Sequence, residues 1–114
     1  MKLQIKRAYE LSGNADGTRI LVDRLWPRGL SRDKAAVDLW FKDIAPSTEL
    51  RRWYAHQPER WPEFRRRYFA ELDLQPEVVS RLRAALGKRS ATFLYAAKDT
   101  ALNNAQALLE YLRG

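Results

Sequence analysis

Thr92-Phe93-Leu94-Tyr95-Ala96 is a short, continuous apolar run that lies between two amphipathic stretches. A run of this length between helical patterns is typical of a strand that is buried on both faces. Arg19-Ile20-Leu21-Val22-Asp23 is a second run of the same kind. Strands that alternate with helices indicate a largely parallel sheet covered by helices. The sequence therefore predicts an α/β fold.

Helical spacing of apolar residues predicts four helices in the later part of the chain. The first follows Ser47, the second contains Trp61 to Leu72, the third begins at Pro76 and ends before Gly87, and the last contains Leu102 to Leu112. Serine suits the residue before a helix, proline the first helical residue and glycine the residue after the end. Ser31 is a candidate cap for one short turn over residues 32–34.

The start of the chain predicts an antiparallel edge of the sheet. Leu3 and Ile5 alternate with polar residues, which favours a strand with one wet face. Because the turn-rich segment 12–17 is short, this strand and the strand at 19–23 are expected to form an antiparallel hairpin. Residues 35–44 fit both a strand and a helix, and alternation favours a strand over 37–42. The expected architecture is a small, mostly parallel sheet with an N-terminal antiparallel hairpin, flanked by helices in a Rossmann-like arrangement of two or three layers.

Length and composition predict one α/β domain over residues 1–114, since 46% of the residues are apolar and can form a core. The absence of cysteine excludes disulfides, thiolate chemistry, iron–sulfur clusters and zinc fingers. His56 is the single histidine, so a multi-histidine metal centre is excluded, and we expect no metal and no cofactor. No apolar run approaches the ~20 residues that span a bilayer, and the N-terminus lacks the apolar segment of a signal peptide. We therefore expect a cytoplasmic protein without a membrane partner.

The net charge of +7 suggests nucleic acid or another polyanion as a partner. The excess is spread along the chain, because residues 1–34 carry eight basic and four acidic groups and residues 51–83 carry eight and five. Such a distribution favours a solvated surface for most of the charge. The nucleic-acid alternative rests on the arginine-rich helices between residues 51 and 67, with contacts from Arg51, Arg52, Arg65, Arg66 and Arg67.

Polar and cationic residues follow each expected parallel strand. In open α/β sheets ligands bind outside the carboxyl ends of the strands, so these residues are expected to meet there. They are Asp23, Arg24, Trp26 and Arg28 after the second strand, Pro46, Ser47 and Thr48 after the third, and Lys98, Asp99 and Asn103 after the fourth. Guanidinium, ammonium and helix N–H groups together predict a pocket for phosphate or carboxylate. The expected partner is a nucleotide or another phosphorylated small molecule.

Each of these residues has an expected role and a structural alternative. Arg24, Arg28 and Lys98 would bind charge, Ser47 would mark a helix start with free N–H groups, and Trp26 would stack on a ring. In the structural alternative, Asp23 and Arg24 pair with each other or with Asp99. In a third alternative the pocket is an enzyme site with Asp23 or Asp99 as the base and Lys98 or Arg24 opposite developing negative charge. No glycine-rich phosphate loop is present.

Three stretches resemble the YeaO-like family, a bacterial domain of unknown function, and the resemblance runs essentially from end to end. The stretches are Val22-Asp23-Arg24-Leu25-Trp26-Pro27-Arg28-Gly29, Ala45-Pro46-Ser47-Thr48-Glu49-Leu50-Arg51 and Leu94-Tyr95-Ala96-Ala97-Lys98-Asp99. The resemblance implies an α/β domain and a bacterial cytoplasmic home, and its motif residues extend to Asn103. Members of the family often carry histidine just after this asparagine, whereas this chain has Asn104. A mechanism that needs an imidazole there is in doubt for this protein.

Overall fold

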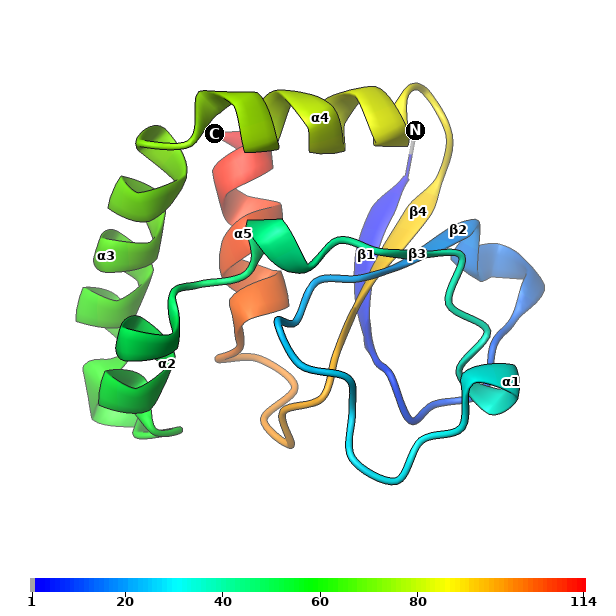
Figure 1. Ribbon diagram of the computed structural model, residues 1–114, viewed down its shortest axis with the longest axis horizontal. Helices are drawn as coiled ribbons and strands as arrows, with labels where there is room; N and C mark the ends of the chain where they lie inside the picture. The colour runs from blue at the N-terminus through cyan, green and yellow to red at the C-terminus, as the bar shows by residue number, and fades with distance from the viewer. Residues whose placement is uncertain (1) are drawn as a thin grey trace.

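The computed structural model describes residues 2–114, which form a four-stranded parallel sheet covered mainly on one face by helices (Figure 1). The strands are β1 (Leu3–Arg7), β2 (Thr18–Leu21), β3 (Leu39–Trp40) and β4 (Ala91–Tyr95), in the spatial order β1-β4-β2-β3. Phe93 of β4 aligns with Ile5 of β1 on one side and with Ile20 of β2 on the other. The prediction of an α/β fold is confirmed.

The predicted N-terminal antiparallel hairpin is wrong, because β4 lies between β1 and β2 and is parallel to both. Residues 8–17 connect β1 and β2, and ten extended residues can reach about 33 Å. A five-residue strand is only about 17 Å long, so the connection can return to the opposite end of the sheet. All five residues of β4 are buried, which accounts for its central position.

The ambiguous stretch at 35–44 forms a strand, as predicted, but only Leu39–Trp40 pair with the sheet. This strand is parallel to β2 and forms one edge of the sheet. The Phe41 N–H donates to the Leu21 carbonyl at 2.8 Å, after which residues 42–44 form a 3₁₀ turn. The sheet therefore ends in a short edge strand, with β1 at the other edge.

The helices lie close to their predicted positions. They are α1 (Arg32–Ala35), α2 (Thr48–Tyr54), α3 (Trp61–Asp73), α4 (Pro76–Leu86) and α5 (Asn104–Arg113). The predicted caps are confirmed, since Ser31 Oγ accepts the Lys34 N–H at 3.2 Å and Ser47 Oγ accepts the Leu50 N–H at 3.1 Å. The last helix starts at Asn104, later than the sequence pattern suggested.

The helices α2 to α5 pack on one face of the sheet and form the main core with it (Figure 1). Ile20, Phe93 and Tyr95 supply this face of the sheet and are almost completely buried. Aromatic rings join the helices, with the ring centroids of Tyr54 and Phe64 stacked at 4.4 Å. The result is a helix layer in which α5 packs along β1 and β4 and α2 packs on α3.

The opposite face of the sheet is covered by the segment between β2 and β3, which includes only the short α1 (Figure 1). Leu21 and Leu94 are fully buried there against Trp26 and Trp40. The two indole rings meet edge to face, with centroids 5.5 Å apart. The fold therefore has one sheet layer and one helix layer, with an irregular covering on the second face.

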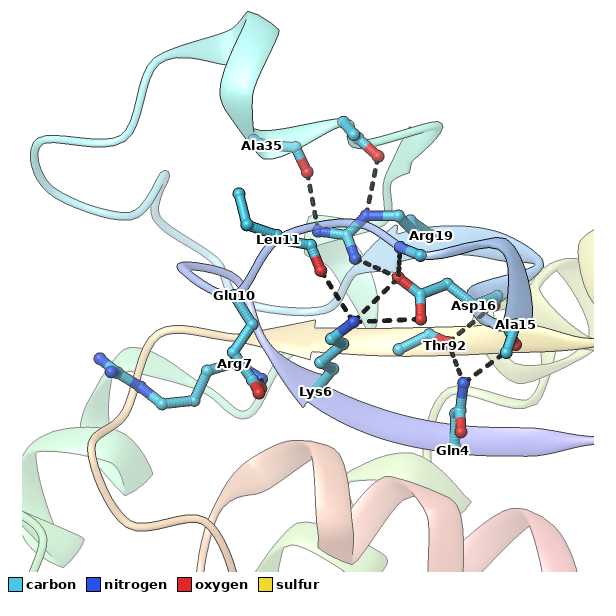
Figure 2. A network of polar contacts seen from close by, with 12 residues as sticks. Gln4, Lys6, Arg7, Glu10, Leu11, Ala15, Asp16, Arg19, Ala35 and Thr92 are labelled. Atoms are coloured by element: carbon cyan, nitrogen blue, oxygen red, sulfur yellow. Dashed lines mark hydrogen bonds and ion pairs between the residues drawn. The ribbon is translucent and has the colours of Figure 1, made fainter.

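A buried ion pair holds this covering to the sheet (Figure 2). Arg19 Nη1 lies 2.6 Å from Asp16 Oδ2, and both side chains are almost fully buried. The same guanidinium donates to the carbonyls of Ala35 and Ala36 at 2.9 and 3.0 Å, while Lys6 Nζ lies 3.2 Å from Asp16 Oδ1. The charged groups of Lys6, Asp16 and Arg19 thus connect β1, β2 and the segment around α1.

Gly17 allows the turn before β2 to approach β4 closely. Its φ is +62°, and a Cβ at this position would lie 2.2 Å from the carbonyl oxygen of Ser90. The neighbouring Thr18 N–H donates to that same oxygen at 3.0 Å. Glycine is therefore required for both the backbone conformation and the contact.

We expect Arg19→Met to destabilise the fold by about 3–5 kcal/mol, because it removes the closest charged partner of the buried Asp16 carboxylate. Urea unfolding followed by circular dichroism measures this change. Arg81→Met is the matched control, since the pair of Arg81 with Asp43 has side chains that are 59% and 60% exposed, and such pairs contribute about 0–1 kcal/mol. Equal effects of the two substitutions would contradict a structural role for the buried pair.

The same pair predicts the direction of acid destabilisation. Burial alone would raise the pKa of Asp16, but the Gly13 N–H and the charges of Arg19 and Lys6 outweigh burial and lower it below 3.8. A lowered pKa in the folded state adds stability above the unfolded value, and this stability is lost as the pH falls through the folded pKa. We therefore expect the unfolding free energy to fall less between pH 5 and pH 2 in Asp16→Asn than in the wild type.

Candidate functional site

Asp23 lies just beyond β2 and connects three elements at the carboxyl end of the sheet. Its Oδ2 accepts the backbone N–H of Ala96, which follows β4, at 2.9 Å. Its Oδ1 accepts a hydrogen bond from Asn104 Nδ2, at the start of α5, at 3.0 Å, and the same amide donates to the Val22 carbonyl at 3.2 Å. The structural alternative, in which Arg24 forms an ion pair with Asp23 or Asp99, is not found among the ion pairs of residues 2–114.

Burial raises the pKa of Asp23 above its ordinary value. The hydrogen bonds from Ala96 and Asn104 oppose this rise, as does the positive charge of Arg51. Arg51, which the sequence assigned to the arginine-rich surface, therefore also acts electrostatically on Asp23. A carboxyl group with a raised pKa is closer to the range of a general base, but both of its oxygens already accept hydrogen bonds within the chain.

Asp99 is also held by backbone amides. Its Oδ1 accepts the N–H groups of Ala101 and Leu102, each at 2.9 Å, and these bonds lower its pKa. Asn103 follows in the same turn, where its Oδ1 accepts the Gln106 N–H at 2.9 Å and its Nδ2 donates to the Asp99 carbonyl at 3.0 Å. The buried Asn103 is thus the cap of α5, and its polar atoms have partners inside the fold.

A carboxylate from α3 binds the residue that caps the start of α2. Glu71 of α3 accepts the Ser47 N–H at 2.8 Å and the Ser47 hydroxyl at 2.6 Å. The first N–H group expected to meet a ligand is therefore already bonded to an anion. Arg24 lies beside this turn, since its Nη2 donates to the Ala45 carbonyl at 3.2 Å, and its buried Nε has no partner among the described residues.

Trp26 and Arg28 belong to the loop that covers the second face of the sheet. The Trp26 indole N–H donates to the Leu30 carbonyl at 2.7 Å, and the Arg32 guanidinium lies over its ring at 4.6 Å. The Trp26 ring was expected to stack on a ligand. It instead makes these two contacts and an edge contact with Trp40 inside the protein. Arg28 is exposed, and only its carbonyl has a described contact, a 2.8 Å hydrogen bond from the Tyr9 hydroxyl.

Arg7 fixes the loop that contains Lys98. Its Nε donates to the Ala97 carbonyl at 2.9 Å and its Nη2 to the Ala96 carbonyl at 3.1 Å. The next residue of this loop, Lys98, is exposed. Arg7 was not among the predicted site residues, because a strand pattern carries no signal for where a long side chain ends.

The arginine-rich helices are largely paired internally. Glu63 lies 2.6 Å from Arg66 and 2.7 Å from Arg67, and these hydrogen bonds lower the pKa of Glu63 to about 2. Arg65 lies 2.7 Å from Glu110. Three of the five arginines predicted to contact nucleic acid therefore have carboxylate partners within the protein.

Two surface hollows lie among the helices. The larger, of about 460 Å³, lies between α2 and α3, and the other, of about 260 Å³, lies among α3, α4 and α5. Of the residues predicted for the anion pocket, Ser47 alone lines either hollow. Along residues 2–114 no three His, Asp or Glu side chains are grouped as metal ligands would be, and no helix has the length and apolar character needed to cross a membrane.

Comparisons with known proteins agree with the sequence motifs. A family model described as "Inactive DUF488-N3 subclade" matches residues 2–114. The chain belongs to this family. The uncharacterized protein YeaO of Escherichia coli strain K12 is 43% identical over 113 residues, covering 99% of this chain and 98% of YeaO. An uncharacterized protein of Mycobacterium tuberculosis strain H37Rv is 42% identical over 113 residues, covering 99% of this chain and 95% of that protein. No solved structure shows significant similarity to the chain.

The predicted resemblance to the YeaO-like family is thereby confirmed. At position 104, where the resemblance led to an expectation of histidine in relatives, the asparagine amide donates to Asp23. An amide cannot exchange protons as an imidazole does near neutral pH. At this position Asn104 therefore donates a hydrogen bond to Asp23 that does not depend on pH near neutrality.

We expect Asn104→Ala to raise the pKa of Asp23 further, because it removes one of the two hydrogen bonds that favour the charged carboxylate. Carboxyl ¹³C NMR titration of Asp23 measures the change. Gln106→Ala, two residues further along α5, is the control, since its side chain contacts Glu110 rather than Asp23. An Asp23 titration that is the same in both variants and the wild type would show that the amide contact has no electrostatic effect.

Proposed function

We propose that the chain is a non-catalytic binding domain that holds a phosphate- or carboxylate-bearing small molecule at the carboxyl edge of its parallel sheet. A nucleotide or another phosphorylated metabolite has the required charge. Neither of the two described hollows is lined by Arg24, Arg51 or Lys98, so the ligand would lie outside both.

The observation that carries this proposal is that positively charged side chains at this edge have no carboxylate partners within the protein. Arg24, Arg51 and Lys98 have no carboxylate within 4.0 Å among residues 2–114. The carboxylates nearby, Asp23 and Asp99, are satisfied by amide N–H groups instead. The positive charges are therefore available to an external anion, and guanidinium groups suit the geometry of phosphate and carboxylate oxygens.

Two observations support binding without catalysis. The oxygens of Asp23 accept hydrogen bonds from Ala96 and Asn104, so the most basic candidate is used to hold the fold together. The family model that matches the chain is described as inactive. In this proposal Asp23 and Asp99 shape the edge, and the enzyme alternative would require one of them to exchange an internal hydrogen bond for a substrate.

We expect millimolar inorganic phosphate or ATP to raise the melting temperature of the wild type, because a ligand that binds only the folded state adds stability. The double variant Arg51→Ala/Lys98→Ala should bind both probes about tenfold more weakly, since each lost cation costs roughly 0.5–1 kcal/mol at an exposed site. Differential scanning fluorimetry and isothermal titration calorimetry measure these effects.

Arg52→Ala is the matched control, because Arg52 is the same residue type on the same helix and is exposed like Arg51. We expect it to retain wild-type affinity. The proposal is overturned if the wild type binds neither probe at millimolar concentration, or if Arg52→Ala weakens binding as much as the double variant does.

A further inference from the structure

Tyr95 is the last residue of β4, an inner strand of the sheet, and its hydroxyl has no hydrogen-bond partner among residues 2–114. The residue is only 2% exposed. The chain has five tyrosines, and the hydroxyls of the other four donate to protein acceptors at 2.6–2.9 Å; these are Tyr9, Tyr54, Tyr68 and Tyr111. A buried tyrosine hydroxyl normally has a partner. The Tyr95 hydroxyl therefore points to an acceptor that is not part of the chain.

Molecules from outside can reach the Tyr95 hydroxyl. Among the buried and half-buried residues that the structure describes, Arg24 Nε is the one completely enclosed polar side-chain atom without a partner. Since the Tyr95 hydroxyl also has no partner, it is not completely enclosed, and part of it lies at the surface. An external acceptor can therefore bond to it without opening the core.

Arg7 of β1 is the cross-strand neighbour of Tyr95. The two residues are paired in register on parallel strands, so their side chains lie on the same face of the sheet. The guanidinium donates from Nε and Nη2 to the carbonyls of Ala97 and Ala96, while Nη1 has no described partner. The Arg7 side chain points away from the buried ion pair (Figure 2) and has no carboxylate within 4.0 Å among residues 2–114. Two neighbouring side chains at the carboxyl edge thus each have an unused donor.

The carboxylates of this edge do not accept the Tyr95 hydroxyl. Glu10 Oε2 accepts the Arg7 backbone N–H at 2.8 Å, and Asp99 Oδ1 accepts two backbone N–H groups of its own loop. Burial raises the pKa of Tyr95, and the charges of these two carboxylates act in the same direction, whereas Arg7 opposes them. The hydroxyl therefore keeps its proton at neutral pH and is a donor without an acceptor inside the protein.

We infer that Tyr95 is a binding residue of the anion site and that its hydroxyl donates a hydrogen bond to a phosphate or carboxylate oxygen of the ligand. The inference rests on the proposed function and names a neutral donor for that site. β4 leads directly into the loop that carries Lys98, so the site extends from this loop back to the end of the strand. The unused Nη1 of Arg7 supplies positive charge beside the hydroxyl.

Tyr95→Phe is the test, because it removes the hydroxyl and keeps the ring in the core. We expect the variant to bind inorganic phosphate and ATP about three- to tenfold more weakly than the wild type does, which is the effect of one hydrogen bond. Isothermal titration calorimetry measures this change. The melting temperature of the variant should equal or exceed that of the wild type, because the hydroxyl has no internal hydrogen bond to lose.

Tyr111→Phe is the matched control. The Tyr111 hydroxyl donates to Asp73 Oδ1 at 2.7 Å, and the residue lines the hollow among α3, α4 and α5. The same substitution at this position should lower the melting temperature and leave the affinity for both probes unchanged. The two variants should therefore show opposite patterns of stability and binding.

Carbon-13 NMR of the tyrosine ring Cζ atoms gives an independent readout. The chain has five such signals, and the one that is missing in Tyr95→Phe belongs to Tyr95. We expect saturating phosphate to shift this signal, because the attached hydroxyl gains an acceptor. The Tyr111 signal, identified in the same way from Tyr111→Phe, should stay in place.

The outcomes separate the two proposals. Absence of binding of both probes to the wild type would overturn the proposed function and this inference together. Binding that Tyr95→Phe retains in full would show that the hydroxyl bonds only to water, and it would overturn the role of Tyr95 alone. A Tyr95 signal that phosphate leaves unchanged, or a melting temperature of Tyr95→Phe well below that of the wild type, would do the same. Weaker binding with retained stability and a shifted Tyr95 signal supports the inference.

Discussion

The hydrogen bonds of Asp23 are the interaction on which the carboxyl edge of this sheet depends. One carboxylate joins the end of β2 to the backbone after β4 and to the first residue of α5. These elements are separated by more than 70 residues in the sequence, so little local structure could align them. Burial disfavours the charge of Asp23, and the amide donors compensate for it. The loops that carry Arg24 and Lys98 are therefore held at a common edge.

A comparison of Asp23 with Asp16 explains why one edge has spare positive charge. The buried Asp16 is neutralised by Arg19 and Lys6, whose charges are consumed in the fold. Asp23 obtains its donors from uncharged amides, which leaves the nearby cations without an internal carboxylate. The same residue type thus stabilises two ends of one sheet by different means, with cations at Asp16 and with uncharged amides at Asp23.

The sequence predicted the elements well and their arrangement less well. Caps such as Ser31 and Ser47 act within one turn of helix, so their pattern is legible locally. The position of β4 between β1 and β2 depends on which strand buries the most apolar surface, and this is a property of the whole sheet. A short connection suggested a hairpin because its length does not reveal that it returns along the sheet.

For the candidate site, the sequence likewise predicted where charged residues lie but not which partners they have. Sequence position correctly brought Asp23 and Lys98 to strand ends, since topology alone fixes that placement. It could not reveal that Glu71 occupies the start of α2, because this contact joins residues 24 positions apart on different helices. It also could not separate Arg51 from Arg66, which look alike in the sequence. Glu63 neutralises Arg66, whereas Arg51 has no carboxylate within 4.0 Å among residues 2–114. The net charge of +7 therefore does not show which cations are free to interact with an external anion. That depends on whether each cation has a carboxylate partner within the protein.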